Sequence, residues 1–138
     1  MLDSKNQFEY SVNMEKVTFL WIINIVLFQI HSFVIVINLF AWMSWKFRKL
    51  HYAVISLTIF SWIVLGFFYG FGYCFLTDWH YDILRDLGYS NLPYSYIKFC
   101  LDSIFGSDLN PFYVDIGTVI GFVIAVAGAV NNLLWRRN

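Results

Sequence analysis

Long stretches without a charged residue alternate with short polar segments along this chain. Residues 17–45, 50–77 and 116–135 contain no Asp, Glu, Lys or Arg. Each run has at least the roughly 20 residues that an α-helix needs to cross a hydrocarbon core of about 30 Å. The pattern predicts an all-α membrane protein, a single membrane domain comprising the whole chain, with three transmembrane helices at about residues 17–45, 50–75 and 115–135.

Two shorter helical patterns fall in the segment 77–113, between the second and third apolar runs. The first has Thr77 as N-cap and ends at Gly88, where glycine suits the left-handed position after a helix. The second begins near Asn91 and ends at Gly106. Both are too short to cross a bilayer and carry apolar residues on one face. We therefore expect two amphipathic helices that form a cap on the outer, periplasmic side.

The basic residues indicate the orientation in the membrane. Lys46, Arg48 and Lys49 lie between the first two runs, and Arg136 and Arg137 follow the third. Basic residues next to a span are retained in the cytoplasm. With three spans, all nine Asp and Glu residues fall on the opposite side. We expect a multi-pass protein of the inner membrane with its N-terminus outside and its C-terminus in the cytoplasm.

Composition narrows the class of protein further. Hydrophobic residues make up 59% of the chain and charged residues 13%, against about 25% charged in a soluble domain. Nine basic residues balance nine acidic ones, so the net charge gives no support for a nucleic-acid partner. The first sixteen residues lack the pattern of a removable signal peptide, so the first span is expected to act as the targeting signal.

A polar row follows one face of the first span. Asn24, His31 and Asn38 recur every seven residues, which keeps them within about 40° of one another around a helix. They either hydrogen-bond across helices and fix packing, or form a site in which His31 binds haem or a metal or relays a proton. Because His51 is expected at the cytoplasmic edge and His80 in the outer segment, the histidines lie at three depths. No metal site is expected within one copy.

A second polar group is predicted in the outer segment. It contains Thr77, His80 and Arg85, and His80 falls on the apolar side of its short helix, toward the spans. Asp115, at the outer mouth of the third span, is one partner for this histidine. A backbone carbonyl or a lipid headgroup is the alternative. The sequence leaves both arrangements open.

Cys74 and Cys100 both fall on the predicted outer side. An oxidising compartment would permit a disulfide that ties the second span to the cap, and two free buried thiols are the alternative. No Cys-x-x-Cys motif supports a redox-catalytic role.

Small residues repeat at intervals of four in two spans. Such a stripe lets another helix approach closely. The stripe in the third span pairs either with that of the second span or with another protein chain. The residues concerned are Gly66 and Gly70 in the second span and Gly117, Gly121, Ala125 and Ala129 in the third.

From His31 onward the chain resembles an uncharacterised family of small bacterial membrane proteins, the domain of unknown function 2784. The resemblance is carried by His31, Trp45 and His51, and by Cys74, Leu76, Thr77, Leu84 and Arg85 in the stretch Cys-Phe-Leu-Thr-Asp-Trp-His-Tyr-Asp-Ile-Leu-Arg. This chain departs from the commoner pattern at Phe75, where proline is usual, and at His80, where glutamate is frequent. The resemblance implies residence in a bacterial inner membrane and a structured outer cap, but no activity.

Two classes of function fit these features. The first is a non-catalytic accessory or complex-forming subunit that docks onto another membrane protein or onto itself. The second is a membrane-embedded binder or enzyme with a lipid, quinone or haem site near the outer leaflet, around His31, His80 and Arg85. No cofactor is predicted, and haem or quinone belongs to the second class only.

Overall fold

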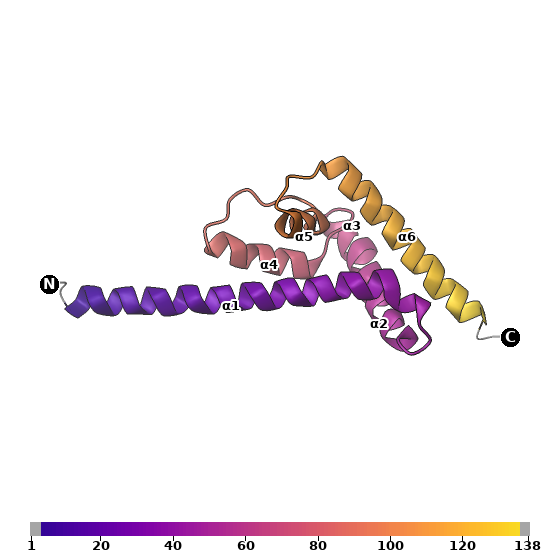
Figure 1. Cartoon of the computed structure of the whole chain (residues 1–138), viewed down its shortest axis with the longest axis horizontal. Helices are drawn as coiled ribbons and strands as arrows, with labels where there is room; N and C mark the ends of the chain where they lie inside the picture. Colours follow the sequence, from indigo (N-terminus) through magenta and orange to yellow (C-terminus); the bar gives the residue numbers. More distant parts are fainter. Residues whose placement is uncertain (1–3, 136–138) are drawn as a thin grey trace.

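The computed structural model describes residues 4–135 and is all-helical over that range (Figure 1). Three helical stretches are long and apolar enough to cross a membrane: Ser11–Met43, Arg48–Tyr69 and Pro111–Leu134. This result confirms the all-α class and the three candidate spans that the uncharged runs predicted.

The first helix, α1 (Ser4–Phe40), is the longest element and continues into a short 3₁₀ helix, η1 (Ala41–Met43). At about 1.5 Å per residue, its 37 residues extend for roughly 55 Å. It contains neither glycine nor proline, so the helix already covers the polar residues that precede the first apolar run. The predicted end at Trp45 was slightly late, because the backbone at Ser44 is extended.

The second span combines α2 (Arg48–Ile59), a π-helical segment η2 (Phe60–Leu65) and α3 (Gly66–Tyr69). The π segment contains Ser61, whose buried hydroxyl donates a hydrogen bond to the backbone oxygen of Tyr73, 3.0 Å away. Gly70 then adopts a φ of 109° and ends the helix. The span therefore stops short of the predicted end at residue 75.

Helix α4 (Phe75–Asp86) follows a short turn. Its N-cap is Cys74 and not Thr77, because Cys74 is the last residue in the extended conformation and the helix begins at Phe75. At the other end Gly88 adopts a φ of 94°, as the sequence predicted. The N–H groups of Gly88 and Tyr89 bond back to carbonyls of the last helical turn in a Schellman motif.

Helix α5 (Tyr96–Phe105) begins later than predicted. Its N-cap is Ser95, whose hydroxyl accepts a bond from the backbone N–H of Lys98 at 3.5 Å. The predicted start near Asn91 was wrong because a proline at 93 disfavours the helical conformation of the residue before it. Gly106 ends the helix with a φ of 63°, which confirms that part of the prediction.

The last helix, α6 (Pro111–Trp135), begins with a proline, which is well suited to a first helical turn. The side chain of Asn110 accepts a bond from the N–H of Phe112 at 3.0 Å and so caps the helix. The third span therefore starts a few residues before the predicted position at 115.

The helices meet in two groups (Figure 1). Helices α2 and α6 pack against the C-terminal end of α1, whereas α4 lies lengthwise along the middle of α1. Helices α4 and α5 share a buried core with α1, formed by Tyr81, Leu84, Tyr96 and Cys100 together with Phe28 and Ile35. The α4–α5 unit is therefore attached to the side of the first span.

Small residues of α6 form its contact with α1. A Cβ at Gly128 would lie 2.6 Å from the Trp42 ring, and one at Gly121 would lie 3.0 Å from Leu39. Ala125 is buried, and Asn132 donates a hydrogen bond to the Trp42 carbonyl at 2.7 Å. The stripe follows 121, 125, 128 and 132, since a spacing of 3.6 residues per turn keeps these positions on one face.

The predicted stripe at intervals of four is therefore only half correct. Gly121 and Ala125 lie in the helix contact, but a Cβ at Gly117 would meet no atom within 4 Å, and Ala129 is half-buried beside Gly128. Gly66 serves a different purpose. A Cβ there would lie 3.5 Å from the Phe71 backbone, so this glycine accommodates the turn that follows its own helix.

Gly70 belongs to the same turn, and a Cβ there would lie 3.4 Å from the hydroxyl of Tyr94. Gly66 and Gly70 therefore do not pack the second span against the third, which was one of the two pairings that the sequence left open. Both glycines allow the backbone to reverse direction at the end of the second span.

Candidate functional site

Both ring nitrogens of His80 have hydrogen-bond partners in the protein's interior. Its Nδ1 lies 2.7 Å from the Tyr96 hydroxyl and its Nε2 lies 2.7 Å from Oδ1 of Asn24. An amide oxygen only accepts, so Nε2 carries the proton and Nδ1 accepts from the phenol. The His80 ring is fully buried, and burial lowers its pKa below the ordinary value of 6.5. A neutral imidazole therefore connects α1, α4 and α5.

His31 lies on the other side of the same tyrosine. Its ring stacks on Tyr96 with centroids 3.7 Å apart and planes inclined by 7°. Its Nε2 is 4.0 Å from Sγ of Cys74, and its buried Nδ1 has no partner. The sequence placed His31 and His80 at different depths and did not connect them. His80 bonds to Asn24, seven residues from His31 on α1, and Tyr96 of α5 contacts both histidines.

The two thiols flank this group without bonding to each other. Cys74 and Cys100 are both free, so the disulfide that the sequence allowed is not formed. Burial raises the pKa of Cys100 to about 11, which keeps this thiol protonated. Burial also raises the pKa of Tyr96 above its ordinary value of 10. The site is thus a neutral, apolar-walled cluster of hydrogen-bonding groups.

The three polar residues of the first span contact different neighbours. Asn24 bonds to His80 and His31 stacks on Tyr96, whereas Asn38 donates to the Thr58 hydroxyl at 2.9 Å in the second span. They share a helix face, as their spacing predicts. They do not converge on one point, because each meets a different element along α1.

The outer group predicted around His80 is not assembled. Arg85 points away from His80 and pairs with Asp82 at 2.6 Å, where both side chains are exposed. Asp115 is exposed on α6, and Thr77 is half-buried on α4. The bonds of His80 go instead to Asn24 and Tyr96. Tyr96 is the site residue that sequence reasoning missed, and no signal in the sequence singled it out.

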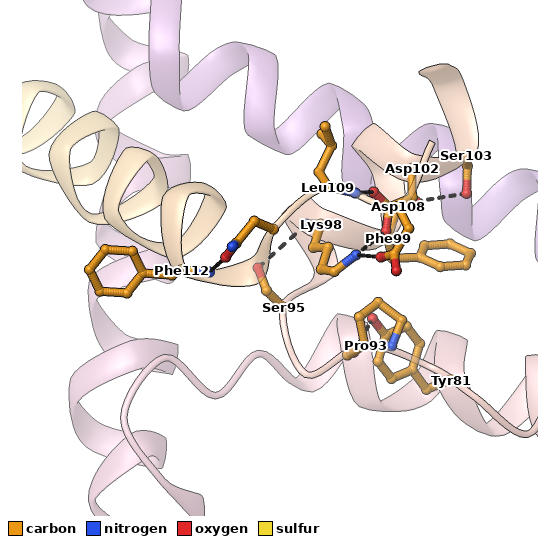
Figure 2. A network of polar contacts seen from close by, with 11 residues as sticks. Tyr81, Pro93, Ser95, Lys98, Phe99, Asp102, Ser103, Asp108, Leu109 and Phe112 are labelled. Carbon is orange, nitrogen blue, oxygen red and sulfur yellow. Dashed lines mark hydrogen bonds and ion pairs between the residues drawn. The ribbon is translucent and has the colours of Figure 1, made fainter. Parts of the chain in front are cut away.

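A second polar network ties α5 to the loop before α6 (Figure 2). Nζ of Lys98 lies 2.5 Å from both Asp102 and Asp108, and Asp102 also accepts a bond from the N–H of Leu109 at 2.9 Å. The bonds to Lys98 and to Leu109 lower the pKa of Asp102. The same carboxylates raise the pKa of Lys98. The i, i+4 spacing of Lys98 and Asp102 was visible in the sequence, but the partner Asp108 was not.

Within residues 4–135, no three His, Cys, Asp or Glu side chains are grouped so that they could hold a metal ion. The pair of histidines around Tyr96 contributes two nitrogens at most. The chemistry open to the cluster is hydrogen bonding, stacking and proton exchange between His80 and the phenol.

The fold and the site define a small all-helical protein with three apolar helices, compatible with a multi-pass membrane protein. The chain belongs to the family described as protein of unknown function DUF2784, whose model matches residues 17–133. The match begins before His31 and so includes Asn24. No curated protein and no solved structure matches the chain.

Proposed function

We propose that this protein is a non-catalytic, complex-forming membrane subunit and that the outward face of α6 binds the same face of a second copy. The observation that carries the proposal is Asn131, an exposed amide on an otherwise apolar helix face. Its side chain makes no hydrogen bond within residues 4–135. In lipid, an unpaired amide is costly, so a helix that offers it a partner is favoured.

The surroundings of Asn131 suit a second helix. The outward face of α6 is a shallow apolar groove on the side opposite the contact with α1. Ala127 supplies a small side chain at its centre, which permits close approach of another helix. The groove is lined by Phe122, Val123, Val126, Ala127, Val130, Asn131 and Leu134.

A second copy is the occupant that matches this groove best. All copies insert in the same orientation, so an α6–α6 contact is parallel and symmetric. Asn131 of one protomer then lies at the same depth as Asn131 of its partner. The two amides can each donate and accept, which allows reciprocal hydrogen bonds across the interface.

Limited packing within one copy supports the same proposal. In the most apolar stretch of each of the three spans, only 22%, 17% and 17% of the residues, in chain order, are buried inside the protein. Most of each span is therefore left for lipid or for another protein. The α6 groove is the part of this surface that combines a small residue with an unpaired polar group.

The test is to measure the monomer–dimer equilibrium of detergent-purified protein by native mass spectrometry and by cysteine crosslinking. Asn131→Leu should weaken dimerisation about fivefold, equivalent to about 1 kcal/mol. Ala127→Cys should form a disulfide-linked dimer on oxidation. Leu57→Cys, equally lipid-facing but on α2, is the matched control and should not crosslink.

The proposal fails if Asn131→Leu leaves the dimer fraction unchanged, or if Leu57→Cys crosslinks as readily as Ala127→Cys. The unmodified chain, analysed in parallel, reports any crosslinking through Cys74 or Cys100. Co-purification of a different membrane protein, lost in Asn131→Leu, would assign the groove to another partner and overturn the choice of a second copy.

A ligand-binding role is the second candidate, and one observation favours it. Nδ1 of His31 is buried without a partner beside Tyr96. A lipid, quinone or haem that reaches this cluster would supply a hydrogen-bond partner for this nitrogen. An absorption spectrum would detect haem, and mass spectrometry of native material would detect a retained quinone or lipid. Folded native protein in which neither method detects a ligand argues against this role.

We also propose an inner-membrane location with the N-terminus outside, the C-terminus in the cytoplasm and the α4–α5 unit on the outer side. The basic loop 46–49 and the absence of acidic residues from it support this orientation. Reporter fusions at the C-terminus test it. A C-terminal alkaline phosphatase that is active in intact bacterial cells contradicts it.

A further inference from the structure

The start of α2 lacks the negative partner that a helix N-terminus normally has. Its N-cap is Phe47, which provides no side-chain hydrogen bond, and no acidic residue lies in the first turn. Instead Lys46, Arg48 and Lys49 surround it. The N-terminus of a helix carries a partial positive charge and free N–H groups, so these cations oppose the dipole.

Three side chains of the same turn have buried polar atoms without partners. They are Arg48 through Nη1, His51 through both ring nitrogens and Tyr52 through its hydroxyl. The His51 ring is fully buried. The backbone carbonyl of Asn38 lies near it but outside hydrogen-bonding geometry. Unpaired buried polar atoms are costly, which indicates that another group completes the site.

Each of the three side chains can donate a hydrogen bond. A guanidinium only donates, a phenol hydroxyl can donate, and a neutral imidazole donates through one of its two ring nitrogens. Positions 48, 51 and 52 are spaced i, i+3, i+4 and therefore lie on one helix face. Arg48 is held by the Trp45 ring, 4.6 Å from the guanidinium carbon. The matching ligand is an anion with several acceptor oxygens.

We propose that the first turn of α2 binds a phosphate group through Arg48, His51, Tyr52 and the free N–H groups of the helix. A helix N-terminus with an arginine is a well-suited phosphate site, because the dipole and the guanidinium act on the same anion. Lys46 and Lys49 are exposed beside it and add long-range attraction. The phosphate is that of a phospholipid headgroup at the membrane surface or free inorganic phosphate.

The experiment measures binding to detergent-purified full-length protein in two arms. In the first, native mass spectrometry follows retention of phosphatidylglycerol after delipidation and re-addition. In the second, inorganic phosphate is titrated while thermal unfolding is monitored. Arg48→Gln should weaken binding at least about tenfold in the arm that shows binding. Lys49→Gln removes the same charge one residue away and should weaken it no more than about twofold.

The substitution Tyr52→Phe tests whether the Tyr52 hydroxyl binds a ligand or is simply left unpaired in the folded protein. Without a ligand, removing a buried unpaired hydroxyl raises the unfolding temperature. With a phosphate bound, the same change weakens binding and lowers the unfolding temperature of the loaded protein.

Retention of the lipid alone identifies the headgroup as the source, and stabilisation by inorganic phosphate alone identifies the free anion. Either result supports the proposal if it depends on Arg48 and Tyr52. The proposal is overturned if neither probe binds, if Lys49→Gln has the same effect as Arg48→Gln, or if Tyr52→Phe stabilises the protein in the presence of both probes.

Discussion

Tyr96 lies flat on His31, with ring centroids 3.7 Å apart, while its hydroxyl contacts Nδ1 of His80 at 2.7 Å. One residue of α5 thus joins a histidine of the first span to a histidine of α4. A face-on stack and an in-plane hydrogen bond use perpendicular directions of the same ring, so the two contacts do not compete. The position of the α4–α5 unit on α1 depends on this tyrosine.

The first prediction concerns the hydroxyl of Tyr96. Tyr96→Phe keeps the stack on His31 but leaves Nδ1 of His80 buried and unpaired, which should destabilise the protein by about 1–3 kcal/mol. Thermal unfolding in detergent measures the change. The control is Tyr94→Phe, because Tyr94 is 81% exposed. It should shift stability by less than about 0.5 kcal/mol, and an equal effect of the two would contradict the assigned role.

The second prediction concerns pH. Burial lowers the pKa of His80 below 6.5, so the unfolded chain binds a proton more readily than the folded protein. The contribution of the neutral His80 is complete above the unfolded value and decreases as the pH falls below it. The unfolding temperature should therefore drop between about pH 7.5 and about pH 5.5.

His80→Gln provides the comparison for the pH experiment. Glutamine cannot take up a proton in this range, so the variant should show a smaller drop over the same interval. A variant that keeps the whole pH dependence would assign it to other groups.

The third prediction concerns Gly128. A Cβ there would overlap the Trp42 ring at 2.6 Å, so Gly128→Ala should push α6 away from α1 and destabilise the protein by about 1–3 kcal/mol. Gly117→Ala is the matched control in the same helix, where a Cβ meets no atom within 4 Å. It should be neutral or stabilise by up to about 1 kcal/mol through helix propensity. Equal effects of the two substitutions would argue against the helix contact.

The fourth prediction concerns the Lys98 network. Asp102→Asn removes the ion pair with Lys98, so the loop 106–110 should be cleaved faster by a protease than in the unmodified chain. Asp82→Asn breaks the exposed pair with Arg85 and should change cleavage little. The pKa of Asp102 is lowered in the folded protein. The contribution of this carboxylate to stability is therefore present at neutral pH and is lost as the pH falls through its folded-state pKa.

Local patterns were sufficient to predict the elements but not all of their ends. Gly88 and Gly106 were found in advance because glycine tolerates positive φ at a helix end. The starts at Cys74 and Ser95 were missed, since residues 77 and 91 offered equally acceptable local signals. Where several caps compete, packing of the helix against its neighbours selects one.

The candidate site, like the helices, could be predicted from the sequence only in part. Burial of His80 could be anticipated, because its helical register places it on an apolar face. Its partners could not, because Asn24 and Tyr96 are 56 and 16 residues away in the chain. For the same reason the sequence could not decide between a disulfide and free thiols at Cys74 and Cys100, or whether Asp115 is the partner of His80. A side chain's register indicates a direction, but not what lies in that direction.

The sequence by itself determined that three uncharged stretches form long helices, because hydrophobic length and helical period are properties of contiguous residues. Only the tertiary structure decided that α4 runs back along α1 and that Tyr96 lies between His31 and His80. These contacts depend on turns at Gly70, Gly72 and Gly88 that set the direction of each following helix. A small change in such a turn moves a distant side chain by many ångströms, so long-range pairing cannot be derived from local spacing.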